Sequence, residues 1–248
     1  MSQLFKDCSR EALALRGTPG LITLWLATLP DLFKTAFEEN FKEITHMSKE
    51  KFHRLGKLAF VLGIGLFYIF ALVAESTYMD PMSWKIYFQF ASAPISMLLL
   101  AVGAAALRSQ YGQSTGRVAS GALAIAAIAA TTGAVGAVVF GMLNPDLAWI
   151  AFISGAEVMF VGIGVFGLSC IRKNILSGVN WLLMLGGFAV PLISMLEGIA
   201  QDVTNNQSAM VLPWWIIQLV TSLAMLSLLA AGLLLQGTQQ TAPKPAKR

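Results

Sequence analysis

The sequence predicts an all-α, polytopic membrane protein with six transmembrane helices, preceded by an amphipathic helix at the membrane interface. The first observation is composition: of 248 residues, 56% are hydrophobic and only 12% are charged, about half the charged fraction typical of soluble domains. The second is length, because six apolar stretches reach the roughly 20 residues that a bilayer requires. The third is charge, because the basic residues gather on one side when these stretches are threaded across a membrane.

The six predicted spans are separated by short polar connections and form one transmembrane domain over 57–236. No alternation with a period of two persists along them, and lipid admits only helices and closed barrels. We therefore predict helices. Their expected bounds are 57–79, 84–107, 117–143, 148–170, 176–198 and 213–236.

Orientation follows from the positions of Lys and Arg. With the N-terminus in the cytoplasm, 16 of the 17 basic residues lie on the inner side and only Lys85 lies outside. Basic loops stay on the cytoplasmic side of a membrane, so the opposite orientation is rejected. Aromatic residues such as Trp84 and Trp149 fall at outer ends, where indole rings favour the headgroup level. We expect both termini in the cytoplasm.

Residues 1–56 differ from the spans and are expected to form a cytoplasmic leader. Within it, 21–47 is predicted to be a helix that is broken or kinked near Pro30. It lies on the cytoplasmic face of the bilayer or, alternatively, packs on the protein's own inner loops. One face of this helix is an apolar stripe with i+4 and i+3 spacing, made of Phe33, Phe37, Phe41 and Ile44.

The two ends of the transmembrane domain carry simpler signals. Ser48 is expected to cap the start of the first span, since a serine hydroxyl can accept a hydrogen bond from a free backbone N–H of the first turn. The segment 237–248 is expected to be a disordered cytoplasmic tail.

The leader carries a resemblance to known proteins. The run LITLWLATLPDLFKTAFEE at 21–39, followed by MSKEKFHRLG at 47–56, resembles a cytoplasmic leader of bacterial multi-pass membrane proteins. Such proteins are often encoded near PadR-type regulators, and similar leaders precede some permease domains of the macrolide-exporter type. The resemblance covers residues 1–65. It implies a bacterial inner-membrane protein and carries over no catalytic or binding residue.

Two short matches suggest an internal repeat. Residues 62–67 resemble 161–166 at an offset of 99, and 94–98 resemble 191–196 at an offset of 97 to 98. Three spans per half would make the second copy inverted, as in many transporters. Chance is the alternative, because spans draw on few residue types. In either case Pro94 and Pro191 are expected to kink their spans, because proline removes an intrahelical hydrogen bond.

Glu157 is the main candidate for chemistry inside the membrane. It lies near the middle of the fourth span, and no Lys or Arg is expected at a similar depth. A lone carboxylate there should be protonated, hydrated or bound to a cation, and such residues are often functional. The alternative is a structural Glu, protonated and hydrogen-bonded to a neighbouring helix.

Most other polar residues of the spans fall in their outer halves. They could line a wet, acidic cavity that opens outward. Alternatively, Ser and Thr bond their own backbone and Gln pairs with a neighbouring helix. The candidate set for a cavity or for a proton or ion site is Glu75, Gln89, Ser92, Ser96, Glu157, Ser194, Glu197, Gln218 and Thr221.

The third span is built from small residues, which let helix backbones approach closely. Gly121, Gly133, Gly136 and Gly141 are expected to serve helix packing, either inside the protein or at a dimer face. Pro94 and Pro191 are likewise expected to serve helix packing.

No pattern of residues predicts a catalytic group, a metal ligand set or a cofactor site. The basic residues lie close to the membrane without interleaved aromatics, so nucleic acid is not an expected partner. Expected partners are the bilayer, anionic lipid headgroups on the cytoplasmic side, and another membrane protein or a second copy through the third span. The sequence favours a non-enzymatic accessory, sensor or partner-binding subunit. The alternative is a small transporter or permease-like protein that uses Glu157.

Overall fold

The described part of the chain is helical apart from its turns and contains six helices long and apolar enough to cross a membrane. The computed structural model describes residues 48–79, 83–143, 146–176, 178–204 and 213–237, which leaves the predicted leader helix and tail outside. The six-span fold class predicted from apolar length is confirmed. The helices are α3 (Lys49–Met79), α4 (Ser83–Thr115), α5 (Arg117–Leu143), α6 (Asp146–Lys173), α7 (Val179–Thr204) and α8 (Trp214–Gly237).

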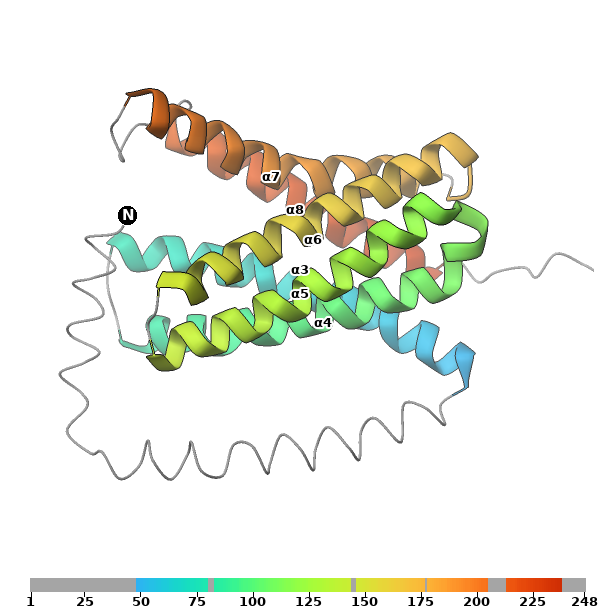
Figure 1. The fold of residues 1–248 in the computed structure, drawn as a ribbon, viewed down its shortest axis with the longest axis horizontal. Helices are drawn as coiled ribbons and strands as arrows, with labels where there is room; N and C mark the ends of the chain where they lie inside the picture. The colour runs from blue at the N-terminus through green and yellow to red at the C-terminus, as the bar shows by residue number, and fades with distance from the viewer. Residues whose placement is uncertain (1–47, 80–82, 144–145, 177, 205–212, 238–248) are drawn as a thin grey trace, which may run out of the picture.

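The six helices form a closed ring. Each packs on its neighbours in the chain, α8 returns to contact α3, and α4 also touches α6. Because the connections are short, consecutive helices run antiparallel, and Figure 1 shows their ends gathering at two opposite ends of the bundle. One end holds the start of α3, the α4–α5 and α6–α7 connections and the end of α8. We call it the basic end, for reasons given below, and the other the distal end.

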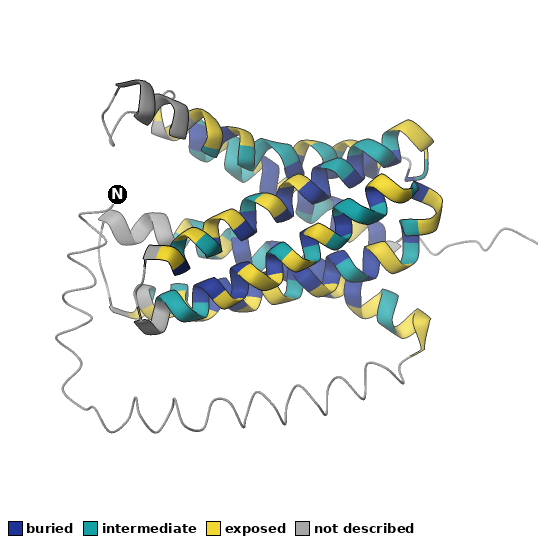
Figure 2. Cartoon of the chain, in the orientation of Figure 1, coloured by how far each residue is buried: buried dark blue, intermediate teal, exposed yellow. Residues whose placement is uncertain are grey.

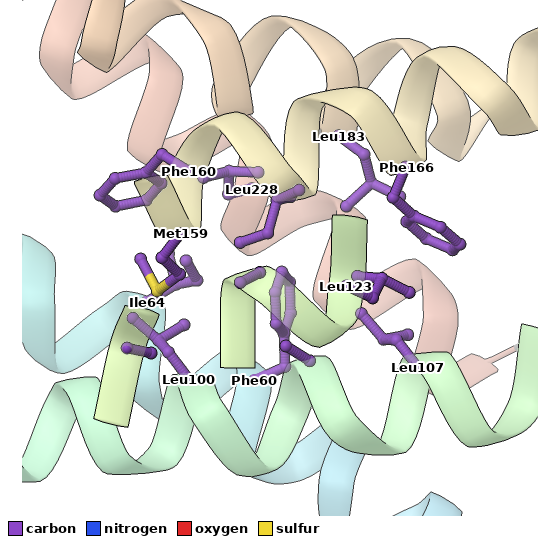
Figure 3. Close-up of a cluster of buried hydrophobic side chains, with 14 of the residues drawn as sticks. Phe60, Ile64, Leu100, Leu107, Leu123, Met159, Phe160, Phe166, Leu183 and Leu228 are labelled. Carbon is purple, nitrogen blue, oxygen red and sulfur yellow. The ribbon is translucent and has the colours of Figure 1, made fainter. Parts of the chain in front are cut away.

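The middle of the ring is filled by large apolar side chains. In lipid the hydrophobic effect does not draw helices together, so tight van der Waals packing must do so. Burial is concentrated on the inward faces, with the exposed positions on the outside (Figure 2). Phe60 of α3, Leu100 of α4, Phe160 of α6 and Leu228 of α8 are each at most 1% exposed, and Figure 3 shows them among neighbouring side chains of the same cluster.

Glycines set how closely α5 and α6 approach. A Cβ placed on Gly136 would lie 2.8 Å from both the Ala148 carbonyl oxygen and the Phe152 nitrogen, and one on Gly155 would lie 2.6 Å from the Ala129 oxygen. Gly133 is part of the same contact, since it lies against Gly155. Gly133 and Gly136 therefore pack inside the protein.

Gly121 lies differently from these two residues. A Cβ there would meet nothing within 4 Å, so this glycine borders open space. Gly141 belongs to the end of α5, where side-chain surroundings are not described.

Most helix ends lie within three residues of the predicted spans, but α3 begins eight residues earlier than predicted, and α4 and α7 end eight and six residues later. Ser48 caps α3 as expected, because its Oγ accepts a hydrogen bond from the Lys51 N–H at 3.4 Å, but the helix begins there rather than at Lys57. The segment predicted to be a polar break, 108–116, stays helical as far as Thr115. Tyr111 accounts for part of this, because it is only 4% exposed and packs on Phe166. Gly116, with a φ of 90°, makes the turn into α5.

The suggested repeat stays a prediction, and one aligned pair of glycines packs differently in its two halves. Gly63 of α3 lies against Leu100 of the following helix, whereas its counterpart Gly162 of α6 lies against Ala122 and Ala126 of the preceding helix α5. Helices α4 and α7 continue through Pro94 and Pro191. The expected kinks stay a prediction.

Candidate functional site

Positive charge marks one end of the bundle. Lys85, in the first turn of α4, is the exception among the described basic side chains. The others lie at the opposite end, on the starts of α3 and α5 and the ends of α4 and α6. The side chains of this basic end are Lys49, Lys51, Arg54, Lys57, Arg108, Arg117, Arg172 and Lys173.

An open groove of about 650 Å³ lies at the basic end between α4 and α5. This volume is within the range of small-molecule sites, roughly 300–1,000 Å³. Two arginines and three neutral polar side chains line it together with four small residues, and none of these nine residues is acidic. The lining residues are Ala105, Arg108, Ser109, Gly112, Gln113, Gly116, Arg117, Ser120 and Gly121.

Hydrogen bonds fix the walls of this basic groove. Arg108 Nε donates to Ser120 Oγ at 3.3 Å, which ties the α4 wall to the α5 wall. His53 Nε2 lies 3.1 Å from Ser109 Oγ, within hydrogen-bonding distance, and joins the start of α3 to α4. Lys173 Nζ, from the end of α6, donates to the Ser114 carbonyl oxygen at 3.3 Å. Four helices therefore meet around the groove.

The polar residues predicted on α4 are partly or fully enclosed. Ser92 and Ser96 are 3% and 0% exposed, and Gln89 is half-buried. Ser96 Oγ donates to the carbonyl oxygen of Ala93 at 2.8 Å, so this hydroxyl is satisfied within its own helix. Ser92 Oγ is buried with no hydrogen-bond partner.

Two of the candidate polar residues, Glu157 of α6 and Ser194 of α7, lie at matching levels by the register of the two helices. Gly164 lies against Gly187, and Gly167 lies against Met184. Seven residues are close to two helical turns, so moving that far toward the distal end along both helices places Glu157 opposite Ser194. Both residues are half-buried. Figure 1 shows α6 and α7 drawing apart toward this end.

The remaining members of the predicted set lie elsewhere. Gln218 and Thr221 are half-buried on α8. Glu75 and Glu197 belong to α3 and α7, in stretches whose side chains lie outside the described part. Among the described members, the α6–α7 register brings Glu157 and Ser194 to matching levels, whereas Ser92 and Ser96 lie on α4, which is not among the packing partners of α7.

A chain of aromatic rings runs through the distal half of the ring. It begins at Phe90 of α4, crosses α5 and α6, passes to α3 and returns to α6, with successive ring centroids 5.1–6.2 Å apart. Such spacing is typical of favourable aromatic pairs. The members of this aromatic chain are Phe90, Phe140, Trp149, Phe152, Phe70, Phe67 and Phe160.

The sequence alone predicted neither the basic groove nor the aromatic chain. The i, i+3 spacing of Phe67 with Phe70, and of Trp149 with Phe152, was a visible signal of shared faces. The groove had a weaker signal. Gly121 follows Arg117 by four residues, and Arg108 lies nine residues before Arg117 across a glycine-containing turn, so a missing side chain leaves room close to two long cationic ones.

No protein-family model matches the chain, and no curated protein or solved structure matches it significantly.

Proposed function

We propose that this protein is a non-enzymatic, multi-pass inner-membrane protein that serves as an accessory or partner-binding subunit, with its basic end and both termini in the cytoplasm. The observation that carries the proposal is the filled centre of the helical ring. Phe67 of α3 and Phe160 of α6 meet there with centroids 5.4 Å apart, and both are buried.

Four hydroxyl groups of the spans support the same interpretation, although Ser92 Oγ on α4 is buried without a hydrogen-bond partner. Thr131, Thr132, Ser169 and Ser227 each donate to the backbone carbonyl four residues earlier, at 2.7–3.0 Å. These groups are satisfied inside their own helices, so they do not need to line a polar pathway. A protein whose interior is filled in this way acts through its outer surface and its termini. The leader is the best candidate for contact with a partner because of its resemblance to leaders of bacterial membrane proteins and its predicted apolar stripe.

In-cell photo-crosslinking tests the partner-binding role. A photoreactive residue replacing Phe37, on the leader's predicted stripe, is expected to give one discrete protein adduct in the native host. The matched control replaces Glu38, which lies off the predicted stripe, and should give much less of that adduct. Absence of a protein adduct at Phe37 and at its stripe neighbours Phe33 and Phe41 would contradict the proposal.

The α6–α7 junction favours a second candidate function, a small transporter. By register Glu157 and Ser194 lie at matching levels where the two helices separate, and a carboxylate at such a position can hold a proton or a cation. In proteoliposomes this alternative expects a proton-coupled or cation-coupled flux that Glu157→Gln abolishes and that the control Glu50→Gln leaves intact. Equal flux from wild-type and Glu157→Gln vesicles removes Glu157 from any transport mechanism.

A further inference from the structure

We propose that the basic groove between α4 and α5 is a binding site for a phosphate group, carried by the headgroup of an anionic phospholipid. This inference is independent of the partner-binding role. It assigns a discrete site with named residues, in place of a general attraction between a basic surface and an acidic membrane.

The charges of the groove select an anion. Arg108 and Arg117 line it from opposite walls, no lining residue is acidic, and Lys173 lies directly behind the α4–α5 turn, with its Nζ 2.8 Å from the position of a Cβ on Gly116. Guanidinium groups bind phosphate through paired N–H donors. Ser109, Gln113 and Ser120 add neutral donors.

Gly121 supplies the space. A Cβ there would meet nothing within 4 Å, and this residue lines the groove together with Ala105 and Gly112. A phosphate with its glycerol therefore has room beside Gly121, between the α4 and α5 walls. The free backbone N–H groups in the first turn of α5, which begins at Arg117, add to the preference for an anion.

The surroundings favour a lipid as the source of the phosphate. Leu98 and Val102 are exposed on α4, at the i−7 and i−3 positions from Ala105. Ile125 and Ile128 are exposed on α5, at the i+4 and i+7 positions from Gly121. These residues continue the two walls of the groove toward the middle of the membrane. An acyl chain can lie along this apolar lane while its headgroup occupies the basic groove.

Native mass spectrometry of the full-length protein, with phosphatidylglycerol and phosphatidylcholine as probes, tests the site. We expect wild type to retain phosphatidylglycerol preferentially, and Arg108→Gln/Arg117→Gln to weaken its binding by at least about tenfold. The control Arg54→Gln/Arg172→Gln removes the same charge from two exposed arginines of the same end that do not line the groove. It should change binding by less than about twofold.

A steric variant tests the same site without changing charge. Gly121→Leu should fill the groove and weaken phosphatidylglycerol binding, whereas Gly121→Ala should bind nearly as wild type does. A Cβ at this position meets no neighbour, so Gly121→Ala is expected to fold, and the open groove gives the longer leucine side chain room to do so as well. This keeps the test decisive if the double arginine variant does not fold.

Competition identifies the source of the phosphate. Retention of phosphatidylglycerol in the presence of millimolar glycerol 3-phosphate or inorganic phosphate supports a lipid site. Displacement by these soluble phosphates overturns the lipid assignment and leaves a site for free phosphate. Equal losses in the Arg108/Arg117 and Arg54/Arg172 variants, or no effect of Gly121→Leu, would overturn the site altogether.

Discussion

The glycines of α5 occupy two different kinds of position. Gly136 touches the backbone of α6, whereas Gly121 borders an open groove. The sequence shows both as members of one small-residue pattern, because spacing along a helix does not reveal which neighbour a face meets. In the membrane, the first kind of glycine stabilises a helix pair and the second leaves space for a ligand.

Replacing these two glycines by alanine should therefore have opposite effects on stability. Gly136→Ala forces a methyl group to within 2.8 Å of backbone atoms of α6, and overpacking of this kind costs about 1–3 kcal/mol. Gly121→Ala meets no neighbour and should be neutral or stabilising by up to about 1 kcal/mol, because alanine favours helix. Thermal unfolding in detergent measures both. Equal melting temperatures would show that α5 and α6 are not packed as described.

At the scale of elements, apolar length predicted all six helices, while the connections between them depended on tertiary contacts. The segment after Leu107 carries Arg108 and other polar residues, which reads as a break, yet α4 continues because Tyr111 is buried against Phe166 of α6. Similarly, helical spacing showed that Ser92 and Ser96 share a face. It did not show that Glu157 lies along the α6–α7 interface, away from Ser92 and Ser96 on α4, because that follows from the order of the helices around the ring.

The contact between α3 and α6 through the aromatic chain has a measurable energy. Phe67→Ala and Phe160→Ala should each destabilise the protein by about 3–5 kcal/mol, as expected for buried phenylalanines. A double-mutant cycle should give a coupling of about 0.5–1.5 kcal/mol, because the rings meet edge to face at 5.4 Å. Leu223→Ala, on the outward face of α8, provides the control with little effect. A coupling energy near zero would mean that these two rings do not meet.

At the scale of the whole molecule, the ring closes where α8 meets α3. A Cβ on Gly232 would lie 2.7 Å from Val61 Cγ2, and Val61 Cβ is one bond, about 1.5 Å, from that atom. The two Cβ atoms are therefore no farther apart than the roughly 4.5 Å upper limit of a disulfide. In a background with Cys8 and Cys170 replaced, Val61→Cys/Gly232→Cys should oxidise readily, as judged by non-reducing peptide mapping. The control Val61→Cys/Leu233→Cys should not, because Leu233 faces outward. Equal oxidation of both pairs would mean that α8 does not meet α3 through Gly232.

The two ends of the ring differ in charge, and the central claim is that they face opposite sides of the membrane with the basic end inside. Labelling of single cysteines by a membrane-impermeant maleimide tests this most directly. The positions are Gln113, exposed at the basic end, and Trp84, exposed at the distal end, each replaced by cysteine in the background without Cys8 and Cys170. The account predicts that Trp84→Cys is labelled in intact cells and that Gln113→Cys is labelled only after permeabilisation. Labelling of Gln113→Cys in intact cells would contradict it.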